Sequence, residues 1–166
     1  MPYSLFWEQK SVRDPLYGFI GLTAQENRIL ETFAIQRLAR IKQLAHTYIV
    51  YPSAVHARLE HSLGSLNVAG RICDQLGIRK KEKMAVRAAA LIHDVGQGPF
   101  SHLFEEVMRF VNGEDYSHED VTKLMTEHNG SLKRALGSSQ QDVLQIFEGD
   151  SLLSEIVSSG LDVDKM

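Results

Sequence analysis

The sequence places a histidine beside a carboxylate at a point where one metal ion would be a partner for both. His93 and Asp94 are adjacent and directly follow the apolar run at residues 88–92. A polar pair so close to a buried face costs free energy if it is left unpaired. A divalent ion accepts neutral imidazole and anionic oxygen together. Neighbouring side chains on a helix point about 100° apart, so His93 and Asp94 can reach one ion only at a helix end. Further ligands must then come from other helices.

On its own, this dipeptide is better explained by a structural hydrogen bond beside a turn, and only its context favours the metal. Upstream, Arg58 and His61 are three residues apart, which places them on one face of a helix. A guanidinium suits phosphate because its fork presents two parallel donors. The pattern therefore predicts a metal ligand beside a phosphate-binding arginine.

The elements that must position these residues are predicted to be helices. Helical spacing of apolar residues recurs from Thr23 onward, whereas strand-like alternation is scarce. Thr23 and Glu26 have the form of a capping box, and Gly77 stands where a helix end favours glycine. Residues 47–51 are the best strand candidate, or else a buried loop. The predicted helices span residues 23–31, 35–44, 58–76, 81–95, 101–111, 117–127, 131–136, 139–147 and 151–158.

Length and composition fit one all-α domain. The chain has 166 residues, 43% of them hydrophobic, which is enough for a single core. We expect residues 1–22 to form an N-terminal arm and residues 23–166 the helical domain, with a minor hairpin near residue 50 as the alternative. Cys73 is the only cysteine, and we interpret it as a buried structural thiol.

The charge and the ends of the sequence bear on partners and location. The net charge of -3 gives no strong sign of a nucleic-acid partner. No apolar run approaches the roughly 20 residues that a membrane helix needs, and the N-terminus lacks a signal pattern. We therefore expect a cytoplasmic protein with no membrane partner.

Three motifs in order resemble those of the HD-domain phosphohydrolases. They are H-x-R-x-x-H-S from His56, H-D-x-G-x-G-P-F-S-H from His93, and D-V-D-K from Asp162. The pattern is most similar to the deoxynucleoside triphosphate triphosphohydrolase group, and it extends from about residue 13 to the last residue. This resemblance implies an all-α HD-domain helical bundle with a metal site between helices.

The resemblance implies four ligands for one divalent metal ion. They are His61, His93, Asp94 and Asp164. Asp162 is a rival ligand, but the family pattern places the ligand immediately before the lysine, which favours Asp164. Nitrogen and oxygen donors suit Mn, Fe, Mg, Co, Ni or Zn, and ligand type does not distinguish among them.

The resemblance also implies which residues act on the substrate. The catalytic set is His102, Glu105, His118 and Arg58, and the substrate-binding set is Gln43, Arg58 and Lys165. The histidines would protonate the leaving oxygen or hold the substrate, and Glu105 would orient one of them. The spacing of three residues makes a pairing of His102 with Glu105 geometrically reasonable. The alternatives are an ordinary helix-start position for His118 and a solvated helix glutamine for Gln43.

The sequence departs from the family pattern at three places. Gln97 stands where many triphosphohydrolases have histidine, and glutamine cannot serve as an acid or a base. Ala39 stands where nucleotide-activated members have arginine, so the sequence does not support activation by a bound nucleotide. The sequence stops at Met166, whereas the family's helix at the last ligand continues, so we expect either a minimal member or a truncated one.

These patterns lead to one functional hypothesis and two alternatives. The first is a metal-dependent phosphohydrolase with a small-molecule phosphate substrate, deoxynucleoside triphosphates being the first choice. The second is an HD phosphatase for nucleoside monophosphates or other phosphate monoesters. The third is a metal-bound regulatory or oligomerisation module with little turnover. The family also leads us to expect a homo-oligomer.

Overall fold

The computed structural model describes residues 10–112, 116–149 and 151–158. Most of these residues are helical, in agreement with the predicted class. The elements in chain order are β1 (Lys10–Asp14), β2 (Gly18–Leu22), α1 (Ala24–Leu30), α2 (Phe33–Gln36), η1 (Arg37–Arg40), η2 (Thr47–Ile49), α3 (Arg58–Gln75), α4 (Lys80–Ile92), α5 (His102–Asn112), α6 (His118–His128), α7 (Gly130–Leu136), η3 (Gly137–Ser139), α8 (Gln140–Glu148) and α9 (Leu152–Val157).

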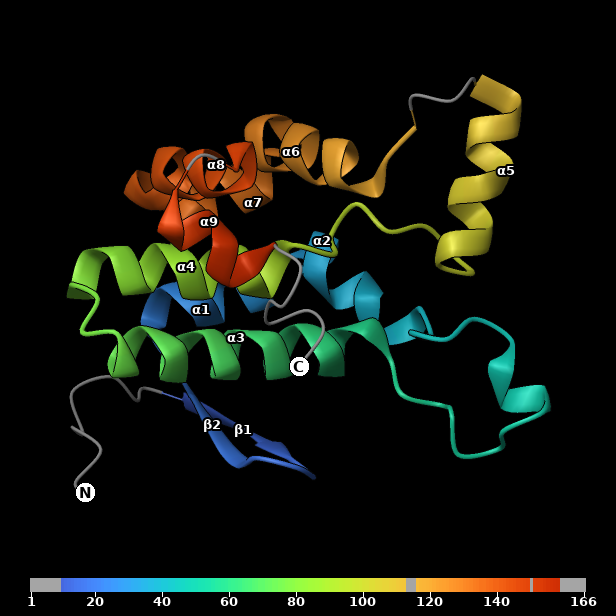
Figure 1. The fold of residues 1–166 in the computed structure, drawn as a ribbon, viewed down its shortest axis with the longest axis horizontal. Helices are drawn as coiled ribbons and strands as arrows, with labels where there is room; N and C mark the ends of the chain where they lie inside the picture. Colours follow the sequence, from blue (N-terminus) through green and yellow to red (C-terminus); the bar gives the residue numbers. More distant parts are fainter. Residues whose placement is uncertain (1–9, 113–115, 150, 159–166) are drawn as a thin grey trace.

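Helices α3 and α4 form a central antiparallel pair (Figure 1). The α6–α9 region covers one side of this pair, and α1 packs beside it, while the β1–β2 hairpin lies against the opposite side. Helix α5 stands away from the rest of the helices. None of the helices in the described ranges is long and apolar enough to cross a membrane.

Helix α4 contributes small side chains to the core that it shares with α3. Ala88, Ala89 and Ala90 are fully buried, and Leu66 and Ala69 of α3 are buried with them. Each large aliphatic side chain in such a core contributes about 1.5–3 kcal/mol through burial. The two helices therefore form a rigid base for residues at their ends.

Cys73 lies on the buried face of α3, as the sequence analysis predicts. Burial raises the pKa of its thiol from 9.0 to about 11, while Lys83 acts in the opposite direction. The thiol is therefore neutral at physiological pH and fills space in the core.

The sequence signals for the starts and ends of helices are largely confirmed. The Thr23 hydroxyl accepts from the Glu26 backbone N–H at 3.1 Å, and the Glu26 carboxylate accepts from the Thr23 N–H at 2.7 Å, which completes the capping box. Gly77 follows α3 with φ of +65°, a conformation that glycine adopts without steric cost. Helix α4 is shorter than predicted and ends at Ile92.

The predicted strand at residues 47–51 is wrong. This segment begins with the short 3-10 helix η2, and Ile49 and Val50 are exposed rather than buried. The strands lie instead within the expected N-terminal arm, where β1 pairs antiparallel with β2. Their turn is stabilised by the Asp14 carboxylate, which accepts from the N–H groups of Leu16 and Tyr17 at 2.8 Å. The aromatic and β-branched composition of residues 47–51 is therefore not sufficient to form a strand.

Residues 35–44 are also less regular than predicted. Helix α2 ends at Gln36 and is followed by the 3-10 turn η1, after which the chain leaves helical geometry at Ile41. Gln43 therefore lies in a loop, where its N–H donates to the His56 carbonyl at 3.1 Å. It is not a solvated helix residue.

Candidate metal centre

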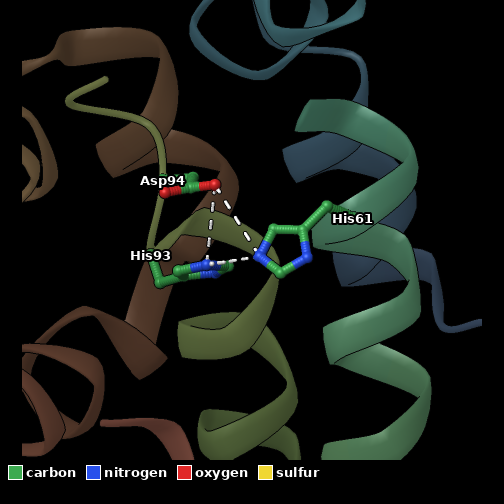
Figure 2. Close-up of side chains that lie close together, drawn as sticks. All are labelled: His61, His93 and Asp94. Carbon is green, nitrogen blue, oxygen red and sulfur yellow. Dashed lines mark hydrogen bonds and ion pairs between the residues drawn. The ribbon is translucent and has the colours of Figure 1, made fainter. Parts of the chain in front are cut away.

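Three of the four predicted ligands converge at one end of the central helix pair. His61 lies in the second turn of α3, His93 caps the end of α4, and Asp94 follows it (Figure 2). The Nε2 atoms of the two histidines are 3.2 Å apart. The Asp94 Oδ2 atom lies 3.9 Å from the His61 Nε2 and 3.7 Å from the His93 Nε2. The three donor atoms thus lie within 4.8 Å of one another.

This spacing fits ligands that share one ion. Atoms about 2.1 Å from an ion lie about 3.0 Å apart at right angles and about 3.4 Å apart at the tetrahedral angle. The separations of 3.2, 3.7 and 3.9 Å are close to these values. Two imidazoles and a carboxylate are also a donor set that divalent transition metals accept. The residues present therefore fit a divalent metal.

A contact behind His93 favours the tautomer that a ligand needs. The His93 Nδ1 lies 2.7 Å from the carbonyl oxygen of Ala90. A carbonyl only accepts, so the proton of this hydrogen bond is on Nδ1, and the lone pair of the neutral ring is on Nε2. Nε2 is the atom that points toward His61 and Asp94. Helix α4 thereby sets both the position and the protonation of this candidate ligand.

Arg58 is buried beside the carboxylate. Its Nη1 lies 2.5 Å from the Asp94 Oδ2, and both side chains are only 3% exposed. The Arg58 Nε donates to the Ser101 hydroxyl at 3.1 Å, and that hydroxyl donates to the Lys42 carbonyl at 3.0 Å. The Arg58 Nη2 is buried without a hydrogen-bond partner among the described residues. The guanidinium thus fixes the carboxylate, while its Nη2 atom is bound to none of the described residues.

The turn after Asp94 is held by α6. The Thr122 hydroxyl donates to the His93 carbonyl and accepts from the Gly96 N–H, both at 2.9 Å. A Cβ atom at Gly96 would lie 2.2 Å from the His118 carbonyl oxygen and 2.6 Å from the Thr122 nitrogen. Glycine is therefore required here by the close approach of the α6 backbone.

A second polar cluster joins α5 to α6. The Glu105 Oε2 lies 3.3 Å from the His118 Nδ1, and the Glu105 Oε1 accepts from the Arg109 Nη2 at 2.9 Å. The Arg109 Nε donates to the Tyr116 carbonyl at 2.9 Å. Glu105 is buried although it belongs to the outlying helix α5. The carboxylate therefore orients the imidazole of His118.

The other predicted site residues are placed less completely. Gln43 has a buried Oε1 without a hydrogen-bond partner in the described part of the chain. Asp164, its rival Asp162, and Lys165 lie outside the described residues, as does the side chain of His102. The described partners of Glu105 are His118 and Arg109, and the pairing of Glu105 with His102 stays a prediction.

Sequence reasoning missed three residues that support the site. Thr122 carries no recognisable signal, because a threonine inside a helix is common. Ser101 lies within the H-D-x-G-x-G-P-F-S-H motif, and its φ of +54° is unusual for a residue other than glycine. Arg37 donates from both Nη atoms to the carbonyl oxygen of Gln97, at 2.8 and 2.6 Å. The role of Arg37 becomes visible only in the structure, through this contact with a backbone atom 60 residues away.

Comparisons with known proteins give a consistent family assignment. The HD domain family matches residues 58–157, the segment that contains the three converging side chains. The human deoxynucleoside triphosphate triphosphohydrolase SAMHD1 is 35% identical over 199 residues, covering 94% of this chain and 32% of the relative. An uncharacterised protein of Bacillus subtilis, YwfO, is 33% identical over 173 residues, covering 96% of this chain and 38% of the relative.

A solved structure shares the fold closely. A phosphohydrolase from Bacteroides thetaiotaomicron superimposes with a TM-score of 0.83 at 33% identity, covering 95% of this chain and 40% of that chain. The chain spans about a third of the length of the curated relatives that it matches. The matched segment, the helical architecture and the converging histidine and aspartate side chains lead to one conclusion: this chain belongs to the HD-domain family.

Proposed function

We propose that the chain is a metal-dependent phosphohydrolase that acts on a nucleotide, with deoxynucleoside triphosphates as the first substrates to test. The observation that carries this proposal is the convergence of the His61 Nε2, His93 Nε2 and Asp94 Oδ2 within 4.8 Å. The similarity to a human deoxynucleoside triphosphate triphosphohydrolase supports the substrate class. Asp164 remains the predicted fourth ligand.

A divalent ion held by these residues supplies Lewis-acid chemistry, activating water and polarising a phosphoryl oxygen. Arg58 holds the Asp94 carboxylate in place at 2.5 Å, and its buried Nη2 can donate to an oxygen of the substrate or of water. Lys165 and Gln43 are proposed to bind the substrate. Because a guanidinium stays protonated, Arg58 stabilises negative charge without taking part in proton transfer.

Proton transfer is assigned to His118. Its Nδ1 is 3.3 Å from the Glu105 Oε2, so the carboxylate orients the ring. The other ring nitrogen can then deliver a proton to the leaving oxygen. His102 is proposed as the second histidine of this group.

Metal content provides the first test, and it needs no knowledge of the substrate. Protein purified without chelators should contain about one equivalent of a divalent metal, and His93→Ala and Asp94→Ala should each lower this content sharply. His128→Ala is the matched control, because His128 is an exposed residue at the end of α6. Unchanged metal content in both site variants would contradict the proposed centre.

Product analysis then separates the functions. Inorganic triphosphate released from a deoxynucleoside triphosphate supports the proposal. Orthophosphate from nucleoside monophosphates or other monoesters indicates the alternative phosphatase. If no substrate is turned over with any of the six metals, the chain is better explained as a metal-bound regulatory or oligomerisation module. The cytoplasmic location and the homo-oligomeric state remain predictions.

A further inference from the structure

Arg37 makes an unusual contact with the metal-site turn. It lies at the start of η1, and both of its Nη atoms donate to the single carbonyl oxygen of Gln97, at 2.8 and 2.6 Å. The two residues are 60 positions apart in the chain. The contact therefore joins the segment after α2 to the loop that follows the His93–Asp94 pair.

An ion pair does not account for the position of Arg37. The guanidinium is half-buried, and burial lowers its pKa, while Tyr116 acts in the opposite direction. Among the residues that the structure describes, no carboxylate lies within ion-pair distance of it. A desolvated cation whose described hydrogen bonds go to one neutral carbonyl is a costly way to join two segments. The desolvation of the Arg37 guanidinium is explained if its function is to hold the Gln97 carbonyl in place.

The carbonyl belongs to the turn that carries a candidate ligand. Helix α4 ends at Ile92, so Asp94 lies beyond the regular helical hydrogen bonds. The Gln97 N–H donates to the Asp94 carbonyl at 2.9 Å, which closes the turn. Thr122 holds the beginning and middle of this segment through His93 and Gly96. Arg37 holds its end.

The end of the turn also carries the buried side chain of Gln97. Gln97 is only 1% exposed. Neither its Oε1 nor its Nε2 has a hydrogen-bond partner in the described part of the chain. Among the described residues, packing and the backbone that Arg37 holds are therefore what set the direction of this amide.

We propose that Arg37 is a positioning residue for the metal centre, which acts by fixing the Asp94–Gln97 turn through the Gln97 carbonyl. This inference rests on the proposed function, since it assigns Arg37 an effect on metal binding and turnover. The described hydrogen bonds of Arg37 go to the Gln97 carbonyl and not to His61, His93 or Asp94. Its effect passes through the backbone between Gln97 and Asp94.

The test compares three variants of the full chain. Arg37→Ala removes the contact, Arg37→Lys keeps the charge but not the forked donor, and Arg40→Ala removes an exposed arginine from the same 3-10 turn. For each protein we would measure metal affinity, kcat and KM. We would also measure amide hydrogen exchange across residues 95–101 and the thermal unfolding midpoint.

Removal of a residue that orients a ligand costs roughly 10–100-fold in metal affinity or activity. We expect a loss of this size in metal affinity or kcat for Arg37→Ala, with KM changed by less than about threefold, and a smaller loss for Arg37→Lys. Exchange across residues 95–101 should accelerate in Arg37→Ala, with Arg40→Ala matching the wild type in every measurement.

Two results would overturn the inference. One is an Arg37→Ala protein whose metal affinity, kcat and local exchange all equal those of Arg40→Ala. The other is a lower unfolding midpoint with unchanged metal affinity, kcat and exchange across residues 95–101, which would make Arg37 a general stabilising residue. If the wild-type protein turns over no substrate, the proposed function fails, but metal affinity and local exchange still decide the role of Arg37.

Discussion

At the scale of single residues, one oxygen atom of Asp94 connects the metal centre to the protein interior. Its Oδ2 accepts from Arg58 at 2.5 Å and also faces both histidines, at 3.9 and 3.7 Å. The carboxylate is thus both a candidate ligand and half of a buried ion pair. Buried ion pairs contribute little net stability when they are intact, but breaking one strands a charge in the interior.

We therefore predict a large loss of stability for Arg58→Ala. Removing one partner of a buried pair costs about 3–5 kcal/mol, and both partners here are only 3% exposed. The double variant Arg58→Ala/Asp94→Asn should recover part of this loss, because asparagine carries no charge. Urea unfolding of the metal-free proteins, monitored by circular dichroism, measures the stability of the single and the double variant. A double variant no more stable than Arg58→Ala would contradict this account.

The Glu105–His118 pair leads to a second prediction at this scale. In Glu105→Gln the side chain keeps its size but loses the carboxylate that holds the His118 ring in position, so kcat should fall by roughly 10-fold or more. Metal content should not change, because the site metal is assigned to other residues. Glu106→Gln is the control, since the neighbouring Glu106 is exposed. Equal kcat values for the two variants would remove Glu105 from the mechanism.

At the scale of elements, the site depends on how closely the turn after α4 approaches α6. The His118 carbonyl and the Thr122 amide leave no space for a side chain at Gly96. The Thr122 hydroxyl, which donates to the His93 carbonyl and accepts from the Gly96 N–H, then fixes the turn at this short distance. The histidine and aspartate of the site are consequently positioned by a helix that supplies none of the three converging donor atoms.

The substitution Gly96→Ala tests this close approach. The added Cβ must displace backbone atoms, so we predict a loss of about 1–3 kcal/mol, typical of overpacking, together with weaker metal binding. Gly64→Ala is the matched control. Its Cβ would meet only the Tyr17 ring at 3.4 Å, and alanine is favoured over glycine within helices such as α3 by about 0.5–1 kcal/mol. In chemical denaturation, the free energy of unfolding of Gly64→Ala should be well above that of Gly96→Ala.

The elements also show what the sequence could and could not predict. The helices with periodic apolar faces and clear ends, such as α3 and α6, were predicted within one or two residues because local signals determine them. The proximity of His61 to His93 and Asp94 was predicted only through the order of the motifs. The contacts of Arg37 with Gln97 and of Glu105 with His118 depend on how distant elements pack, and no local spacing encodes this.

At the scale of the whole molecule, the buried Cys73 links stability to alkaline pH. Its pKa is 9.0 as a free group and about 11 in the fold. A raised pKa in the folded state means that the folded chain retains the proton longer than the unfolded chain. The contribution of this thiol to stability is therefore complete below pH 9 and is lost as the pH rises toward 11.

We predict that the free energy of unfolding falls by roughly 2–3 kcal/mol between pH 9 and 11 through this group, at about 1.4 kcal/mol for each pKa unit. Cys73→Ala should be less stable at neutral pH, because it leaves a small cavity, but its stability should decline less steeply over the same range. Unfolding curves at several alkaline pH values measure this slope. Parallel slopes for the two proteins would rule out the thiol as the cause.

The position of α5 has a consequence for local unfolding. This helix stands apart from the others in Figure 1, and Phe110 is 92% exposed. Helices with little buried surface open at lower free-energy cost than the core. We expect the amides of α5 to exchange with solvent faster than those of α3 and α4. Because α5 carries Glu105, the carboxylate that orients His118 would be in place only while this helix is folded. The folding equilibrium of α5 would therefore limit the fraction of molecules that are competent for proton transfer.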